Sequence, residues 1–131
     1  MKSVLIISDD QELAANLKAA LWSNRFSLRI LRGNELVVED LNQTKPDLIL
    51  IDFLLNDANG GSLCHEIRGY HGLHHIPVIL LSEYPDIERF TAKFGCNAII
   101  RKPILAHELI NTLTMMLQRP GISQQSFSKA S

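Results

Sequence analysis

Leu48-Ile49-Leu50-Ile51-Asp52 is the stretch that decides the fold of this chain. Four Leu and Ile residues in succession, with no polar alternation, are typical of a β-strand that is buried on both faces. Such strands belong to parallel sheets that helices cover on both sides. Asp52 then lies at the carboxyl end of the strand, which is the edge where open α/β sheets place their functional sites.

Three other apolar segments have the same design, because each of them runs directly into a polar group. They are predicted as strands at residues 2–8, 78–82 and 97–101. If all four strands are parallel, their carboxyl ends meet at one edge of the sheet. The sequence therefore predicts one cleft that gathers Asp9, Asp10, Asp52, Ser82 and Lys102.

Helices are predicted between the strands, since apolar residues recur there at spacings of three and four. They cover residues 11–23, 33–43, 61–70, 85–94 and 104–118, and a half-exposed strand is predicted at 26–31. The helix at 33–43 is expected to turn Leu36, Val37 and Leu41 inward. The five alternating β/α units indicate a doubly wound parallel sheet with right-handed crossovers and helices on both faces.

The length of 131 residues fits one domain, which we predict at residues 1–118, with a flexible tail or truncated linker at 119–131. The net charge of −1 gives no basic field, so no nucleic-acid binding is expected of this domain. Cys64 and Cys96 have neither metal-binding nor redox spacing, and we interpret them as small buried residues with free thiols. The apolar run at the start is too short for a signal peptide or membrane span, which favours a cytoplasmic location.

The predicted cleft suits phosphoryl chemistry. Three carboxylates repel one another unless a cation binds between them. Mg²⁺ is the cation that carboxylate, water and phosphate oxygens typically coordinate. Lys102 adds a second positive charge, and Ser82 offers a hydroxyl to a phosphoryl oxygen. An Asp carboxylate can itself be the nucleophile that forms an acyl phosphate, and Asp52 at the centre of the group is the candidate.

Simpler interpretations stay open for single residues. Asp9 or Asp10 can serve only as a helix cap, and Ser82 can be a hydroxyl that merely ends a strand. Pro103 can be an ordinary trans proline in the first turn of a helix. The histidines of the loop at 71–75 have no acidic or cysteine partner nearby in the sequence, so we interpret them as solvated.

The whole constellation resembles the receiver domain of two-component response regulators, over about residues 2–118. The features that carry the resemblance are an acidic pair after the first strand, a lone Asp after the third, a Ser after the fourth and a Lys-Pro pair after the fifth. The resemblance implies a flavodoxin-like (βα)5 fold with strand order 2-1-3-4-5. It also implies that the peptide bond before Pro103 is cis.

The roles of the site residues follow from the same resemblance. It implies that Asp52 is the phosphoacceptor and that Lys102 and Ser82 contact the phosphoryl group. It implies a Mg²⁺ cofactor bound by Asp9, Asp10, Asp52 and the backbone carbonyl of Leu54.

The function implied is that of a signalling domain and not of an enzyme with its own substrate. A sensor histidine kinase or phosphotransfer protein would donate a phosphoryl group from a phosphohistidine to Asp52, and slow self-hydrolysis would remove it. The fourth helix, last strand and last helix would relay the signal to an output domain or downstream protein. No membrane partner is expected, and the domain is expected to be a monomer or weak dimer.

Three positions depart from the pattern of that family. Ile99 stands where an aromatic residue usually turns inward, Glu83 stands where a small residue keeps the phosphoryl site open, and Leu55-Asn56 replaces the usual Met-Pro. The acidic residues and the lysine that phosphorylation needs are intact. The departures support an alternative, in which the domain keeps the fold but docks partners independently of phosphorylation.

Overall fold

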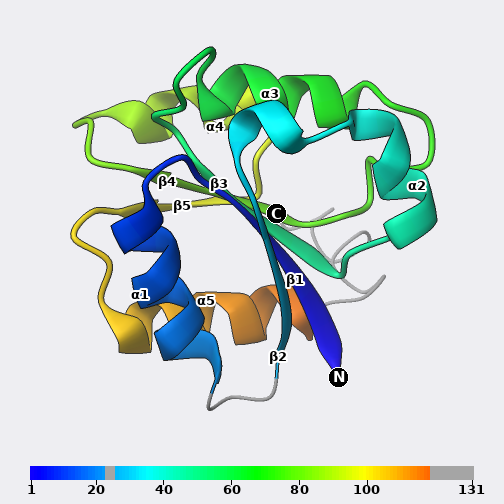
Figure 1. The fold of residues 1–131 in the computed structure, drawn as a ribbon. Helices are drawn as coiled ribbons and strands as arrows, with labels where there is room; N and C mark the ends of the chain where they lie inside the picture. Colours follow the sequence, from blue (N-terminus) through cyan, green and yellow to red (C-terminus); the bar gives the residue numbers. More distant parts are fainter. Residues whose placement is uncertain (23–25, 119–131) are drawn as a thin grey trace.

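The structure, a computed structural model, describes residues 1–22 and 26–118 of the chain. Its centre is a five-stranded parallel sheet with strand order β2-β1-β3-β4-β5 (Figure 1). The strands are β1 (Lys2–Ile7), β2 (Phe26–Leu31), β3 (Leu48–Asp52), β4 (Val78–Ser82) and β5 (Ala98–Arg101). The order confirms the predicted flavodoxin-like fold, whereas the tail predicted at 119–131 lies outside the described residues.

Helices cover both faces of the sheet, as the alternation of β and α units predicts. One face carries α1 (Gln11–Trp22) and α5 (Ala106–Leu117), and the other carries α2 (Leu41–Thr44), α3 (Gly60–Arg68) and α4 (Thr91–Phe94) (Figure 1). Short 3-10 helices are η1 (Gly33–Glu35), η2 (Val38–Asp40) and η3 (Ile87–Phe90). Because the sheet is enclosed, its strands can be apolar on both sides.

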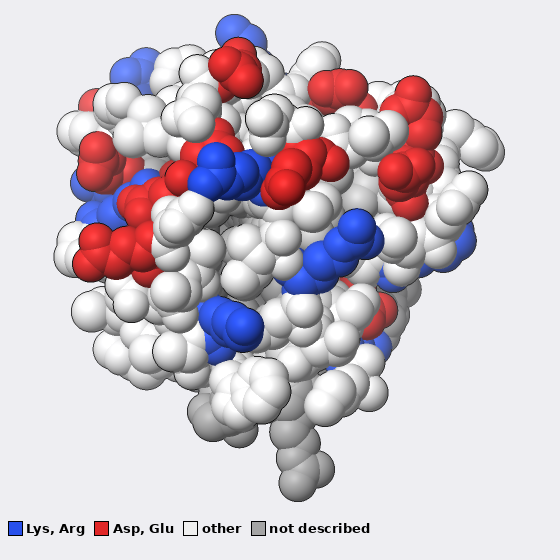
Figure 2. Space-filling view, in the orientation of Figure 1, with Lys and Arg blue, Asp and Glu red and all other residues white. Residues whose placement is uncertain are grey.

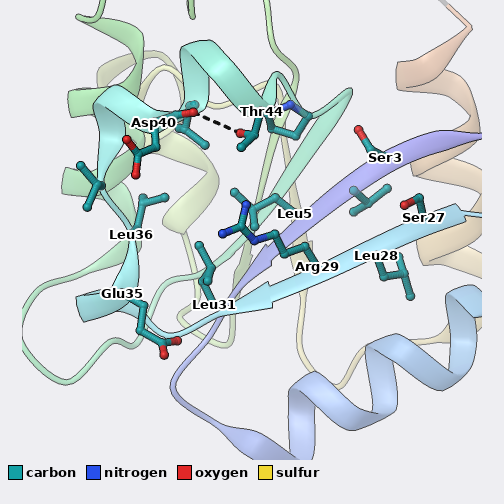
Figure 3. Close-up of a pocket in the computed structure, with 14 residues that line it drawn as sticks. Ser3, Leu5, Ser27, Leu28, Arg29, Leu31, Glu35, Leu36, Asp40 and Thr44 are labelled. Atoms are coloured by element: carbon teal, nitrogen blue, oxygen red, sulfur yellow. Dashed lines mark hydrogen bonds between the residues drawn. The ribbon is translucent and has the colours of Figure 1, made fainter.

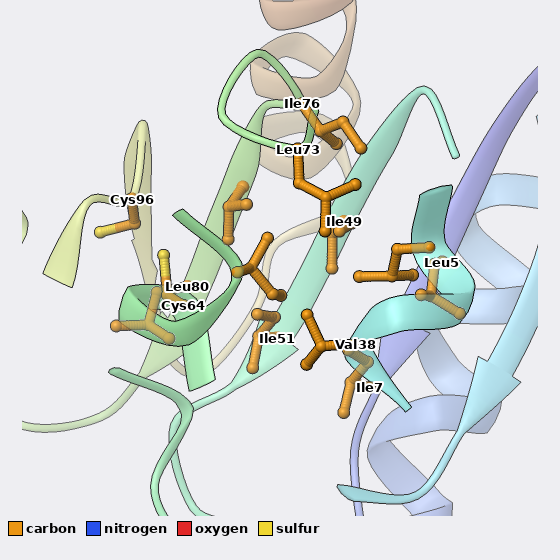
Figure 4. Packing of buried hydrophobic residues seen from close by; sticks show 13 residues of the cluster. Leu5, Ile7, Val38, Ile49, Ile51, Cys64, Leu73, Ile76, Leu80 and Cys96 are labelled. Atoms are coloured by element: carbon orange, nitrogen blue, oxygen red, sulfur yellow. The ribbon is translucent and has the colours of Figure 1, made fainter. Parts of the chain in front are cut away.

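The central strand β3 contributes to two hydrophobic cores. Ile49 and Ile51 pack on the side of α2 and α3, in the cluster shown in Figure 4. Leu48 and Leu50 pack on the opposite side, against residues of α1 and α5. This alternation of side chains explains why an uninterrupted apolar run is stable here, since each residue finds an apolar partner on its own side.

The prediction of one helix at residues 33–43 is wrong. The segment forms η1, η2 and the single turn α2, and Val37 is 49% exposed while its neighbour Val38 is 5% exposed. The β-branched Val37 takes an extended conformation between the two 3-10 helices, which interrupts the helical register. Leu41 is buried as predicted, so only part of the expected apolar face is correct.

The segment predicted as a helix at residues 85–94 is also irregular. The chain forms η3 and then α4 there. Asp86 takes a left-handed conformation with φ of 63°, which keeps a regular helix from starting at Pro85.

A cavity of about 200 Å³ lies where the irregular segment after β2 covers the sheet incompletely. Figure 3 shows Leu5, Leu31 and Leu36 around it, with Arg29 of β2 extended beside them. Thr44 donates a hydrogen bond from its hydroxyl to the carbonyl of Asp40 at 3.3 Å, which closes the last turn of the segment. The cavity thus lies between strands β1 and β2 and the segment of short turns that follows β2.

The surface is of mixed charge on the face that Figure 2 shows, where Lys and Arg are scattered among Asp and Glu. Arg101 and Glu88 form an ion pair of 3.4 Å in which both side chains are about half exposed. Such a pair contributes little to stability, because water screens it. Within residues 1–22 and 26–118, no helix has the length and apolar character needed to cross a bilayer.

Gly60 begins α3 in close contact with β3. A Cβ atom at this position would lie 2.5 Å from the carbonyl oxygen of Asp52 and 2.9 Å from Cγ2 of Ile51. Gly60→Ala is therefore expected to lower the free energy of unfolding by about 1–3 kcal/mol, as measured by urea denaturation. Gly69→Ala is the matched control, because the atom nearest to its Cβ is 3.6 Å away. Equal destabilisation of both variants would contradict the steric argument.

Candidate functional site

The strand registers bring polar residues together at the carboxyl edge of the sheet. Ile7 of β1 is paired with Ile51 of β3, so the residues that follow them, Ser8 and Asp52, lie at the same level. On the other side of β3, Asp52 is paired with Leu81, one residue before the end of β4. The predicted convergence of strand ends is thus built by hydrogen-bonded neighbours, with Asp52 on the middle strand.

Asp52 is a buried carboxylate whose two oxygens both have partners. It is only 1% exposed. Its Oδ1 accepts a hydrogen bond from Nζ of Lys102 at 2.7 Å and another from the backbone N–H of Leu54 at 3.3 Å. Its Oδ2 accepts a hydrogen bond from the hydroxyl of Ser8 at 3.1 Å. The ammonium group and these donors offset the cost of burying the charge.

Lys102 reaches Asp52 from the end of β5. Its backbone N–H donates to the carbonyl of Ser82 at 2.9 Å, which continues the β4–β5 pairing past the last strand residue. The Lys102 side chain is 16% exposed, so its ammonium group keeps contact with solvent while it pairs with Asp52. The peptide bond between Lys102 and Pro103 is cis, as the resemblance implies.

Asp9 and Asp10 have different positions although they are adjacent in sequence. Asp9 accepts backbone hydrogen bonds from Gly33 at 3.0 Å and from Asn56 at 2.7 Å. It therefore joins the loop after β2 to the loop after β3, at the rim of the cleft. Asp10 is exposed, and its Oδ1 accepts a hydrogen bond from the N–H of Leu13 at 3.1 Å, which caps the start of α1.

Ser82 lies at the end of β4 and is fully buried. Its hydroxyl oxygen accepts a hydrogen bond from the backbone N–H of Tyr84 at 3.1 Å. Tyr84 packs edge-on against Phe53, with 5.4 Å between the ring centroids. Glu83 is exposed, and Ile99 is partly buried against the core on the α3 side.

Ser8 is a site residue that the sequence pattern does not single out. Its buried hydroxyl donates to Asp52 and accepts a hydrogen bond from the backbone N–H of Asp10 at 3.1 Å. The acidic residues after β1 attract attention first, but the parallel register puts Ser8 and not Asp9 beside Asp52. Counting from the last residue of each strand is the signal that could have identified it.

The donor set of the cleft fits Mg²⁺ with two carboxylates. In the described parts of the chain, no three side chains of His, Cys, Asp or Glu converge as a metal site. Asp9 and Asp52 both present carboxylate oxygens, each of which can accept more than one partner. Magnesium in proteins commonly takes one or two carboxylates and completes its shell with carbonyl oxygens, water and phosphate.

These features define a flavodoxin-like α/β domain with a lysine-paired Asp at the carboxyl edge of its sheet. The family model described as the response regulator receiver domain matches residues 4–114. The chain therefore belongs to the response regulator receiver domain family. A receiver domain is a signalling module of two-component systems and not an enzyme in the ordinary sense.

Curated relatives include the transcriptional regulatory protein GltR of Pseudomonas aeruginosa, which is 28% identical over 125 residues, covering 94% of this chain and 52% of GltR. The sensory transduction protein RegX3 of Mycobacterium tuberculosis is 25% identical over 130 residues, covering 98% of this chain and 56% of RegX3. The chain thus spans about half the length of the curated relatives it matches.

Solved structures confirm the fold. A putative response regulator from Chloroflexus aurantiacus has a TM-score of 0.82 and 26% identity, covering 90% of this chain and 98% of that one. The receiver domain of a sensor histidine kinase from Pseudomonas aeruginosa, with a magnesium ion coordinated in its active site cleft, has a TM-score of 0.80. It is 23% identical and covers 88% of this chain and 97% of its own.

Proposed function

We propose that this domain accepts a phosphoryl group on Asp52 from the phosphohistidine of a sensor histidine kinase or phosphotransfer protein. The observation that carries the proposal is the buried Asp52 carboxylate held by Nζ of Lys102 at 2.7 Å. A carboxylate fixed beside an ammonium group can attack phosphorus while the added negative charge is offset. Such a donor kinase also favours a cytoplasmic location.

The phosphoryl transfer forms one bond and breaks one bond. An oxygen of Asp52 attacks the phosphorus, the bond from phosphorus to the imidazole nitrogen of the donor breaks, and the nitrogen keeps the electron pair. The product is an acyl phosphate on Asp52. Lys102 then pairs with a phosphoryl oxygen, and the Ser82 hydroxyl donates to another.

Asp9, Asp52 and the backbone carbonyl of Leu54 would hold Mg²⁺, which supplies positive charge against the phosphoryl oxygens when it is bound. The magnesium in the active site cleft of the Pseudomonas aeruginosa receiver domain supports a cation in this cleft, without naming its ligands. Asp10 caps α1, so we assign it a weaker role in the metal site than Asp9.

Ser8→Asp is expected to bind Mg²⁺ about tenfold more tightly than the wild-type chain, because a third carboxylate then lies beside Asp52. Calorimetric titration with Mg²⁺ measures the effect without any phosphorylation. Ser8→Ala is the matched control, which removes the hydroxyl without adding charge. If Ser8→Asp and Ser8→Ala have the same affinity, the cation does not bind at this edge of the sheet.

Intact mass spectrometry tests the proposed function. The full chain is incubated with acetyl phosphate, a small acyl phosphate donor, in the presence of Mg²⁺ or of excess EDTA. We expect one added phosphoryl group with Mg²⁺ and a large loss of labelling with EDTA. If neither acetyl phosphate nor a cognate kinase labels the chain, the proposal is wrong.

We propose that a signal on Asp52 leaves the domain through the surface of α4, β5 and α5. An output domain or separate downstream protein would receive it, and the greater length of GltR and RegX3 supports an attached output domain. The domain itself is residues 1–118 in this proposal, with 119–131 as a tail or linker.

The alternative is a module that docks partners independently of phosphorylation. Ile99 in place of an aromatic residue and the exposed Glu83 near Ser82 favour it. So do the hydrogen bonds that groups of the chain itself donate to both Asp52 oxygens. Partner affinity measured with the phosphorylated and unphosphorylated chain separates the two functions, because the alternative requires equal affinities.

A further inference from the structure

The cavity between β1, β2 and the short turns after β2 combines an apolar wall with charged groups. Its volume is about 200 Å³, and Leu5, Leu31 and Leu36 contribute to the wall, as Figure 3 shows. Pockets for drug-sized ligands typically measure roughly 300–1,000 Å³, so this cavity admits only a small molecule. The cavity is separate from the cleft at Asp52, because no residue described above for that cleft lines it.

Arg29 is a charged residue at a sheet position where an apolar side chain is expected. It is paired with Leu5 of β1, so both side chains lie on the face of the sheet that α2 and α3 cover. Leu5 is 4% exposed and belongs to the core on that face, whereas Arg29 is exposed. Figure 3 shows the Arg29 side chain leaving β2 toward the segment that carries Leu36 and Asp40. Its guanidinium has no hydrogen-bond or ion-pair partner among the described residues, so its donors are free at the cavity.

Asp40 contributes the opposite charge. It is the last residue of η2, it is exposed, and it lines the same cavity. Its backbone carbonyl accepts the hydrogen bond from Thr44, but its carboxylate has no partner in the part of the chain that the structure describes. Glu35, the other carboxylate of the cavity, accepts a hydrogen bond from the backbone N–H of Arg32 at 2.7 Å. One guanidinium and one carboxylate, which do not pair with each other, are thus available to a ligand.

We propose that this cavity binds a small α-amino acid with an apolar side chain, such as leucine. The ligand carboxylate would accept hydrogen bonds from the guanidinium of Arg29, and its ammonium group would pair with the carboxylate of Asp40. Its side chain would leave water and pack against Leu5, Leu31 and Leu36. A ligand with only one charge would leave one of the two charged side chains unpaired, so the cavity favours a zwitterion.

This binding site goes beyond the proposed phosphorylation and does not depend on it. The ligand is bound without any covalent step, and neither Asp52 nor a cation takes part in its recognition. Binding can therefore be measured on the full unphosphorylated chain in the absence of Mg²⁺.

Isothermal titration calorimetry and thermal unfolding test the proposal with leucine, valine and methionine as probes. Three relatives of leucine separate the contributions: 4-methylpentanoate lacks the ammonium group, 3-methylbutylamine lacks the carboxylate, and glycine lacks the apolar side chain. We expect leucine to bind and to raise the Tm, and each of the three relatives to bind at least about tenfold more weakly. Failure of all three amino-acid probes to bind would overturn the proposal. Equal affinity of leucine and any of the three relatives would overturn the recognition described here.

Substitutions of the two charged residues test where the amino acid binds. Arg29→Gln and Asp40→Asn are each expected to weaken leucine binding at least about tenfold, and both residues are exposed, so the fold is expected to be retained. Arg89→Gln is the matched control, because Arg89 is an exposed arginine of η3 that does not line the cavity. It is expected to bind leucine as the wild-type chain does.

Unchanged affinity of Arg29→Gln and Asp40→Asn would overturn the site. Charged residues on an edge strand such as β2 can also serve only to prevent pairing with another chain. In that case Arg29→Gln would associate with itself more readily and bind leucine no more weakly than the wild-type chain. Size-exclusion chromatography of the variant, beside the titration, distinguishes this outcome from the loss of a ligand contact.

Discussion

A chain that carries Asp52→Asn is expected to incorporate no phosphoryl group under conditions that label the wild-type chain. The carboxamide has nearly the same shape as the carboxylate, so the packing at the end of β3 is retained. It lacks the charged oxygen that attacks phosphorus, and an acyl phosphate cannot form on it. Intact mass spectrometry after incubation with acetyl phosphate and Mg²⁺ measures the loss.

Asp57→Asn is the matched control for this experiment. Asp57 is an exposed carboxylate in the loop that follows β3, so its replacement makes the same chemical change outside the buried site. We expect Asp57→Asn to be labelled as well as the wild-type chain. Persistent labelling of Asp52→Asn would place the phosphoacceptor at another residue, and loss of labelling in both variants would indicate a general effect of charge.

The sheet and its central site could be predicted because apolar strands carry a strong local signal. The continuous run that ends in Asp52 admits few other structures, and the parallel arrangement then fixes which ends meet. Lys102 follows from the same reasoning, since it stands directly after the last strand. The pairing of these two residues is the part of the site where sequence and structure agree most closely.

The contacts of the other acidic residues could not be predicted from their presence alone. Asp9 and Asp10 are equivalent in a motif, yet Asp9 joins two loops and Asp10 caps a helix. The difference depends on where β1 ends, and a shift of one residue changes which side chain faces the neighbouring strand. Ser8 occupies that facing position, so its role emerges only from the register.

The irregular segments failed as predictions because helical spacing is a weak signal over short lengths. The residues from 33 to 43 have apolar spacing that suits a helix, but Val37 leaves the core and Val38 enters it. Short helices depend on tertiary packing more than on their own propensity. The left-handed Lys45, with φ of 44°, then ends α2 before Pro46.

Lys102→Met is expected to lower the free energy of unfolding by about 3 kcal/mol in the absence of divalent cations. Methionine retains an apolar stem of similar length but removes the ammonium group that faces Asp52. The buried carboxylate then keeps only neutral donors, the hydroxyl of Ser8 and the N–H of Leu54. Urea denaturation of the variant and the wild-type chain measures the difference.

The double variant Asp52→Asn/Lys102→Met separates charge from packing. If the unpaired carboxylate causes the loss, removing it restores most of the stability, since an amide costs less to bury than a charge. A double variant as unstable as Lys102→Met would instead assign the loss to the lysine stem.

Adding Mg²⁺ is a second test of the same loss of stability. A cation bound at Asp9 and Asp52 would replace the missing ammonium and stabilise Lys102→Met more than the wild-type chain. Equal stabilisation of the two chains by Mg²⁺ would mean that the cation does not act on Asp52.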